Sequence, residues 1–171
     1  DAERLAKFEK RGSGYRKAWP ALPQHYQRLM AADSLTVNGK KWQIIIGHGH
    51  SPEHMALYCP ELDVLISGDM LLPRISTNIS VFAATPDANA LGWFLDSLDT
   101  MAAEIPGSAL VLPSHGLPFR GVQPRVEALH AHHADRLAAL ESSCEQAPKS
   151  AAELLDVLFN RALDTHQTMF A

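Results

Sequence analysis

The chain has 171 residues, 46% of them hydrophobic and 20% charged, which is the composition of an ordinary globular protein with enough apolar material for a core. Its formal net charge of -4 leaves no excess of basic side chains to neutralise phosphates, which argues against a nucleic-acid partner. No apolar run is long enough to cross a bilayer, so a membrane partner is not expected. The two cysteines lie far apart in apolar surroundings, and we expect free thiols in a cytoplasmic protein.

The first half of the sequence predicts two short helices and then two pairs of strands. A charged segment over residues 1–11 has helical spacing and stops at a Gly-Ser-Gly run, and residues 23–32 begin with a proline that suits a first helical turn. The spacing then changes to alternation, and Asn38-Gly39 marks a tight hairpin turn between apolar runs. Strands are expected at residues 35–37, 41–46, 55–59 and 64–67.

The second half predicts helices on either side of one more strand. After a loop-like stretch, Asp87 is expected to cap a helix that runs to Glu104, with apolar residues three or four positions apart. Residues 109–112 read as a buried strand, and a continuous apolar stripe predicts a long helix over residues 122–146. A capping-box pattern at residues 150–153 then begins a last helix.

This order of elements predicts an α/β fold in two parts. Residues 1–122 are expected to form a partial α/β domain that contains all the strands. Residues 123–171 are expected to form an incomplete helical region that follows it.

Three polar residues each follow an apolar run that ends in a loop. His50 lies in the Gly- and His-rich segment after Ile46, Asp69 follows Ser-Gly, and His115 follows Pro-Ser. Strand ends in an α/β sheet are common places for ligands, because the sheet fixes the position while the loop leaves the side chain free. Imidazole and carboxylate are the usual ligands of a hydrolytic zinc, and a carboxylate can bridge two cations. The sequence therefore predicts a metal site.

Other polar residues near this segment have weaker patterns. We expect His54 to hydrogen-bond the loop or to orient a ligand. Arg74 and Asn78 follow Asp69 in a loop at the predicted pocket rim, where they would meet an anionic group of a substrate, although a polar surface loop explains them equally well. The histidines at positions 130, 132 and 133 are expected to be packing or solvated residues of the long helix.

These motifs resemble a known family. Gly-His-Ser-Pro-Glu-His at residues 49–54, Ser-Gly-Asp at residues 67–69 and Ser-His-Gly at residues 114–116 are similar to the second half of the metallo-β-lactamase superfamily. The resemblance implies the C-terminal half of an αβ/βα sandwich, followed by a winged-helix-like helical region. It also implies that His50 binds one zinc, Asp69 bridges two metals and His115 binds the second, with His54 and Asp69 assigned to catalysis.

The resemblance implies a metal-dependent hydrolase with a small-molecule substrate. Acyl-ester or thioester hydrolysis is the leading chemistry, and two Zn²⁺ ions are the expected cofactors, although Mn²⁺ and Fe²⁺ also suit these ligands. One alternative is a phosphodiesterase or endoribonuclease of the same superfamily. Another is a non-catalytic packing or oligomerisation module with a vestigial site.

The sequence departs from the family in one important respect. The motif His-x-His-x-Asp-His, which supplies the other metal ligands of the family, is absent, and His25 stands alone upstream of Gly47. We therefore expect this chain to be the later part of a longer hydrolase and to be inactive by itself. Its expected partner is the missing N-terminal half, and the sheet face that would meet that half is expected to favour homo-oligomers.

Overall fold

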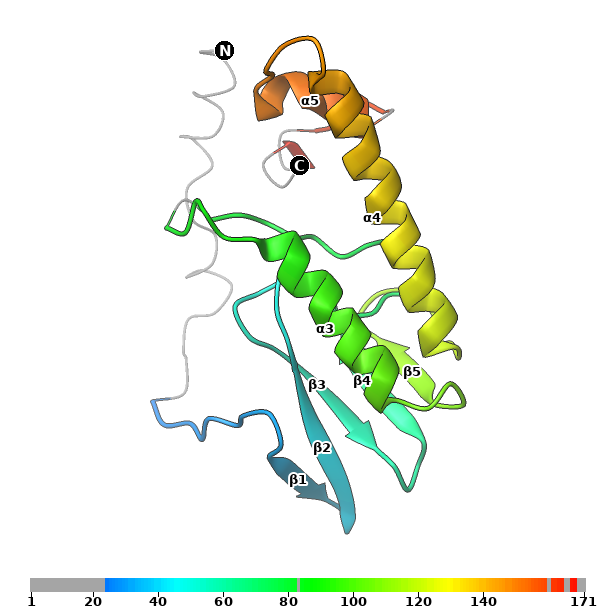
Figure 1. The fold of residues 1–171 in the computed structure, drawn as a ribbon. Helices are drawn as coiled ribbons and strands as arrows, with labels where there is room; N and C mark the ends of the chain where they lie inside the picture. Colours follow the sequence, from blue (N-terminus) through cyan, green and yellow to red (C-terminus); the bar gives the residue numbers. More distant parts are fainter. Residues whose placement is uncertain (1–23, 83, 160, 165–166, 169–171) are drawn as a thin grey trace.

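A five-stranded mixed sheet lies at the centre of the part of the chain that the computed structural model describes, residues 24–82, 84–159, 161–164 and 167–168 (Figure 1). The strands stand side by side in chain order. The first four run antiparallel to their neighbours, and the fifth runs parallel to the fourth. The strands are β1 (Ser34–Val37), β2 (Lys40–Gly47), β3 (His54–Cys59), β4 (Val64–Gly68) and β5 (Leu110–Pro113).

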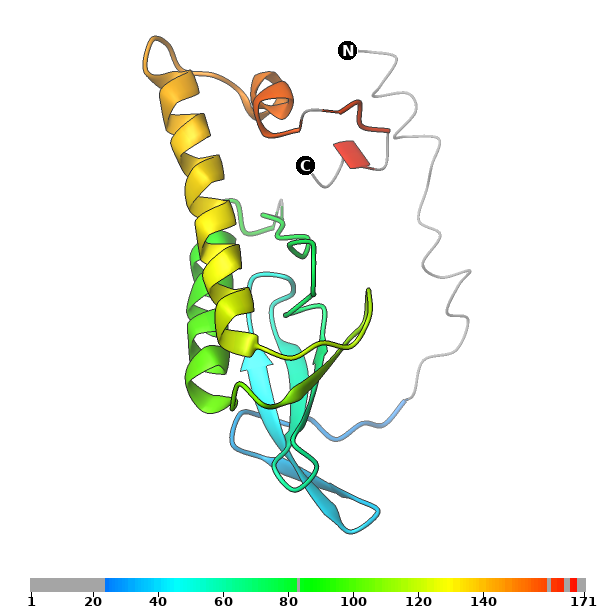
Figure 2. The same ribbon diagram turned by 90° about the vertical axis from the view of Figure 1, so that its right-hand side faces the viewer.

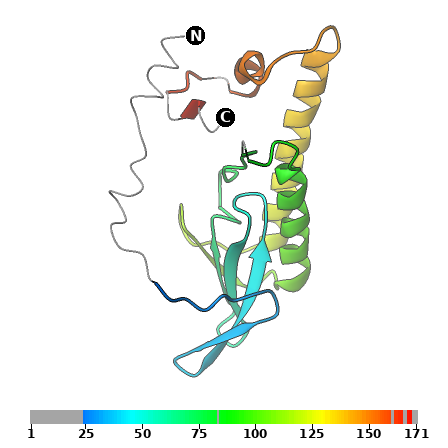
Figure 3. The same cartoon turned by 90° about the vertical axis from the view of Figure 1, so that its left-hand side faces the viewer.

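Two helices cover one face of the sheet. Helix α3 (Ala90–Glu104) connects β4 to β5, and helix α4 (Val122–Cys144) follows β5. Figures 2 and 3 show both helices on the same side of the strands. Side chains that alternate along the strands point to this side, and each large one that is buried contributes about 1.5–3 kcal/mol of stability. The core that results includes Ile45, Ala56, Tyr58, Leu65 and Val111 from the sheet, Phe94, Leu98 and Met101 from α3, and Val122, Val126 and Leu129 from α4.

The opposite face of the sheet is also apolar. Strand pairing places Ile46 opposite Met55, Ile44 opposite Leu57 and Leu57 opposite Ile66, so these side chains share one face. None of the described helices lies on this face (Figure 2). Met55 remains 43% exposed and Ile66 38% exposed. An apolar face of this kind is typical of a surface that packs against another layer.

The C-terminal helices leave the sheet. In α4 the buried side chains are confined to its first third, and Leu137 further along is 45% exposed. Helix α5 (Ala151–Leu158) begins with the predicted capping box between Ser150 and Glu153 and packs against α4. The division of the chain at residue 123 stays a prediction.

Two helices differ from the sequence predictions. Residues 24–32 form an irregular segment and a turn in place of the predicted helix, and Asp33 closes this turn by accepting a hydrogen bond from the Met30 amide at 2.8 Å. A ten-residue helix is marginal in water unless its apolar face is packed, and only Leu29 here is half-buried. Helix α3 begins later than expected, because Asn89 rather than Asp87 accepts from the Gly92 amide and caps it. The predicted helix over residues 1–11 lies outside the described residues.

No described helix combines the length and the apolar character that crossing a membrane requires. Cys59 is buried in β3 and Cys144 ends α4, and both are free thiols.

Charge on the open sheet face is expected to suppress self-association. Met55→Lys together with Ile66→Lys should shift the 171-residue chain toward monomer in size-exclusion chromatography and lower its binding of a hydrophobic dye several-fold, because ammonium groups are not tolerated in an apolar contact. Leu62→Lys changes an exposed leucine in the turn between β3 and β4 and should alter neither property. An unmodified chain that is monomeric and binds no dye would contradict an exposed apolar face.

Candidate metal centre

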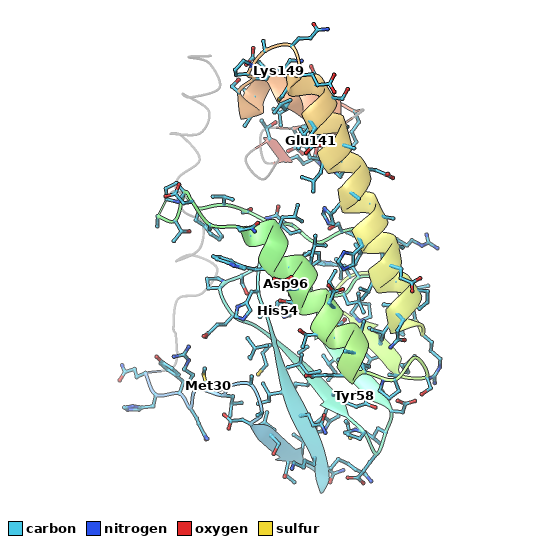
Figure 4. The ribbon with its side chains drawn as sticks, in the orientation of Figure 1. Met30, His54, Tyr58, Asp96, Glu141 and Lys149 are labelled. Carbon is cyan, nitrogen blue, oxygen red and sulfur yellow. The ribbon has the colours of Figure 1, made fainter. Side chains whose placement is uncertain are left out.

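Strand pairing gathers the polar residues of the predicted site at one end of the sheet. Gly47 at the end of β2 pairs with His54 at the start of β3, which closes the loop that carries His50. Because β3 and β4 are antiparallel, the start of β3 lies beside the end of β4, where Asp69 follows. The parallel strand β5 ends at the same edge and delivers His115. Figure 4 labels His54 at this end of the strands.

Asp69 lies between two imidazole rings. Its Oδ2 is 3.3 Å from Nε2 of His50, and its Oδ1 is 3.4 Å from Nε2 of His115. Oδ1 also accepts a hydrogen bond of 2.5 Å from the Ser114 hydroxyl. The side chains of His50 and Asp69 are about one-quarter exposed, whereas that of His115 is 69% exposed. Each carboxylate oxygen therefore faces a different imidazole, and the site opens to solvent on the side of His115.

The orientation of the His50 ring is fixed by the loop over residues 73–80, which we call the rim loop. Nδ1 of His50 lies 2.8 Å from the carbonyl oxygen of Asn78 and 2.9 Å from the hydroxyl oxygen of Thr77. Because a carbonyl oxygen can only accept, the proton of a neutral His50 sits on Nδ1. Nε2 then keeps its lone pair and directs it toward Asp69.

This lone pair and the carboxylate oxygen repel one another unless a positive charge lies between them. The same holds for His115 where its Nε2 carries a lone pair. A proton or a metal cation would satisfy either contact, and imidazole nitrogen with carboxylate oxygen is a donor set of divalent zinc sites. In donor chemistry, His50, Asp69 and His115 therefore fit a cation.

The three side chains do not enclose one. Within the described ranges, no three of the His, Cys, Asp and Glu side chains are close enough together to hold a metal ion as a set. The reason is the bridging position of Asp69, which spreads the donors over two points with one imidazole at each. Neither point has the four ligands of a structural zinc or the three of a catalytic zinc.

His54 supports the backbone at Asp69. The Asp69 amide donates to Nε2 of His54 over 3.2 Å, and Nδ1 of His54 is buried without a partner among the described residues. Burial, and then the neighbouring His50, lowers the pKa of His54, so the ring stays neutral at neutral pH. Gly68 has a positive φ of 55°, and a Cβ there would collide with this ring. Glycine at this position is therefore what allows His54 to approach the backbone.

The chain is similar to known families and solved structures. A family model described as the metallo-beta-lactamase superfamily matches residues 15–115, and one described as the metallo-beta-lactamase-like C-terminal domain matches residues 137–171. The chain is similar to the crystal structure of a beta-lactamase domain protein from Burkholderia ambifaria, with 44% identity over 99% of this chain and 48% of that chain and a TM-score of 0.94. The chain belongs to the metallo-beta-lactamase superfamily.

A second solved structure supports the same family. A metallo-beta-lactamase family protein from Thermus thermophilus is 36% identical over 86% of this chain and 48% of that chain, with a TM-score of 0.74. The chain thus spans about half the length of each of these two proteins. No protein with a curated description matches it. Members of the metallo-beta-lactamase superfamily are mostly hydrolases and typically bind metals.

The other polar residues considered in the sequence, on the rim loop and on α4, differ in their exposure and contacts. Arg74 is exposed on the rim loop, where it borders two hollows. Asn78 contacts His50 through its backbone carbonyl, while its side chain donates to Ser80. The histidines of α4 differ from one another: His130 contacts Asp99 of α3 at 2.7 Å, and His133 lies half-buried against Phe94.

Three residues that contact or anchor the site had no predicted role. Ser114 belongs to the Ser-His-Gly motif, so its place beside Asp69 follows once β5 is paired parallel to β4. Thr77 lies in the loop-like stretch but has no distinguishing pattern. Arg125 donates from Nε to the Leu72 carbonyl at 2.6 Å and from Nη2 to the Ile75 carbonyl at 3.0 Å, and thereby ties the rim loop to α4.

His133 is a second anchor of the rim loop, and it makes stability depend on pH. Its Nε2 is 2.9 Å from the Ser76 hydroxyl, and burial first, then His132 and Arg136, lowers its pKa from 6.5 to about 4. Between these values the unfolded chain binds more protons than the folded chain, so stability falls as pH decreases through this window. The pKa of His132 is lowered in the same direction, first by burial and then by Arg136 and Arg125.

We expect the melting temperature of the chain to fall as the pH is lowered from 6.5 toward about 4. His133→Gln keeps a polar group near Ser76 but cannot titrate, so it should reduce this fall by a few degrees, as thermal denaturation followed by circular dichroism would measure. His25→Gln, at an exposed position outside the site, is the control and should leave the pH dependence unchanged. An identical pH profile for His133→Gln would show that the pKa of His133 is the same in the folded and the unfolded chain, and would contradict this account.

Proposed function

We propose that this chain is the C-terminal half of a metal-dependent hydrolase with the αβ/βα sandwich of its superfamily. In this proposal His50 and His115 would each hold one cation, and the Asp69 carboxylate would serve both. The observation that carries it is that the two carboxylate oxygens of Asp69 face different imidazoles, at 3.3 and 3.4 Å. A carboxylate that only stabilised a turn would not be expected to face one imidazole with each of its oxygens, whereas a carboxylate that bridges two cations would.

The residues of the chain would position the reacting groups. Asp69 would fix the spacing of the two cation sites, and the Ser114 hydroxyl would hold one of its oxygens in place. The rim-loop carbonyl at Asn78 would keep the lone pair of His50 on Nε2. When bound, divalent cations supply Lewis acidity to the carbonyl under attack. Zinc suits this set of nitrogen and oxygen donors best, and manganese and iron are also compatible with it.

The remaining ligands would come from an N-terminal half outside this chain. Two imidazoles and one carboxylate are too few for a tight two-metal centre. The proposal is supported by the solved relatives, of which the chain covers 48%. It is also supported by the open apolar face of the sheet, where Met55 and Ile66 would pack against the second layer.

The surroundings of His115 favour an acyl ester or thioester as substrate. A hollow of about 510 Å³ borders this histidine. Its walls are mostly apolar, which suits the hydrocarbon part of an acyl group, and Arg74, which also lines it, would meet an anionic group of the substrate. The apolar residues of this hollow are Pro73, Ile75, Leu117, Pro118 and Phe119.

The ligand assignment predicts which substitutions remove metal. Asp69→Ala should lower the zinc content of the purified chain by about tenfold or more, and His50→Ala should lower it less, because Asp69 serves both cation sites. Elemental analysis after dialysis against a fixed zinc concentration would measure this. His48→Ala is the matched control, since His48 lies on the same loop but turns to the Pro52 carbonyl. Unchanged zinc in both Asp69→Ala and His50→Ala would refute the assignment.

Activity is best tested in a full-length protein. A chimera in which this chain replaces the matching part of the Burkholderia ambifaria relative is expected to fold, given the TM-score of 0.94, and to hydrolyse a short acyl thioester. Asp69→Asn in the chimera should reduce kcat by at least about a hundredfold, because it removes the charge of the bridging carboxylate.

The parent relative is the control for folding and metal content. A chimera that binds metal but cleaves RNA and no thioester would favour the phosphodiesterase alternative. One that binds metal and cleaves neither would favour a non-catalytic module.

A further inference from the structure

A second and larger hollow borders the rim loop. Its volume is about 880 Å³, and its other walls are α4 and the segment around Leu158 and Phe159 at the end of α5. Sites for small organic ligands usually measure about 300–1,000 Å³, so this hollow is of the size that holds an organic molecule and is too large for a single inorganic ion.

The charge of this hollow is strongly one-sided. Arg74, Arg125, Arg136 and Arg161 line it, and among its described lining residues there is no Asp or Glu. Within the described part of the chain, none of these arginines lies within ion-pair distance of a carboxylate. Arginine remains charged at any ordinary pH, so the described lining of the hollow carries a net positive charge.

Backbone carbonyls hold some of these guanidinium groups in place. Arg125 donates to the carbonyls of Leu72 and Ile75, and Arg136 donates from Nη2 to the Leu158 carbonyl at 2.9 Å. The guanidinium of Arg136 also lies 5.1 Å from the centre of the Phe159 ring. Carbonyl dipoles orient a guanidinium without cancelling its charge, and each group has five N–H donors, so donors remain available to a ligand.

Besides burial, the positive charge of the arginines lowers the pKa of the neighbouring imidazoles. After burial, Arg136 and Arg125 are the next causes that lower the pKa of His132. Arg136 also contributes to the low pKa of His133, which is about 4. Both rings are therefore neutral near pH 7, and they offer hydrogen bonds to a ligand without adding charge.

We propose that this hollow binds an organic phosphate, with the arginines on its phosphate groups and the apolar walls on its organic part. Guanidinium groups bind phosphate oxygens through paired, charge-assisted hydrogen bonds, which makes phosphate the anion that several arginines lining one hollow recognise best. The apolar lining, which includes Ile79, Leu129 and Phe159, would make no favourable contact with an inorganic ion. A small molecule fits better than a nucleic acid, because the positive charge is confined to one hollow of a chain whose net charge is -4.

The hollow is connected to the candidate metal centre through the rim loop. Arg74 and Ile75 line this hollow and also the one beside His115, and the same loop fixes His50 through Thr77 and Asn78. We infer that the substrate is an acyl ester or thioester whose leaving group carries phosphate. This second step rests on the proposed hydrolase function, whereas the binding of phosphate to the hollow does not.

Titration of the 171-residue chain with adenosine diphosphate by isothermal calorimetry tests the binding step. EDTA is present throughout, so that a metal-bridged phosphate cannot account for the heat. Arg74→Gln and, separately, Arg161→Gln should each weaken binding about tenfold, because each removes a charge-assisted contact. Arg120→Gln is the matched control, since Arg120 is exposed, donates to the Ser108 carbonyl and lies outside the hollow, and it should leave the affinity unchanged.

Three further outcomes decide between the alternatives. Inorganic pyrophosphate should bind at least tenfold more weakly than adenosine diphosphate, and equal affinity would overturn the organic part of the proposal. A single-stranded RNA decamer that binds more than about a hundredfold tighter than adenosine diphosphate would overturn the assignment to a small molecule. No binding of adenosine diphosphate by a chain that circular dichroism shows to be folded would overturn the site itself, and would leave the zinc measurements on Asp69 unaffected.

Discussion

The parallel pairing of β5 with β4 is the constraint on which the candidate site depends. Helix α3 carries the chain from one end of the sheet to the other, so β5 begins where β4 begins, and Gly68 pairs with Pro113 at the far end. The residues that follow both strands, Asp69 in one case and Ser114 in the other, then meet at a single edge. With an antiparallel β5, His115 would lie a full strand length away, and Asp69 would face one imidazole only.

Local signals were sufficient for most of the elements. The Asn38-Gly39 turn, the alternation of the strands and the capping box at Ser150 are contained in a few neighbouring residues, and the structure confirms each of them. The helix expected over residues 23–32 was wrong because its apolar side chains are not supported by packing. The stripe along α4 predicted its length well, yet its buried side chains extend only as far as Leu129.

The site was predictable where it depends on side chains at strand ends, and less so where it depends on the backbone. His50, Asp69 and His115 were placed together from the sequence, and in the structure Asp69 lies 3.3 Å from His50 and 3.4 Å from His115. The contact of Asn78 is made by its carbonyl, and no sequence pattern specifies the direction of a carbonyl in an irregular loop. The rim loop that carries this carbonyl is held by Arg125 and His133 on α4, which contact Ile75 and Ser76 from about fifty residues further along the chain.

The conformation of Gly68 has a consequence for the interpretation of related sequences. A β-carbon at this position would occupy the space of the His54 ring. The backbone there is also left-handed, so any other residue would both collide with the ring and adopt an unfavourable backbone conformation. A related chain that keeps the histidines and the aspartate but has a larger residue at the position of Gly68 cannot have the same arrangement around Asp69. Gly68 is thus a more sensitive marker of an intact site than the neighbouring Asp69.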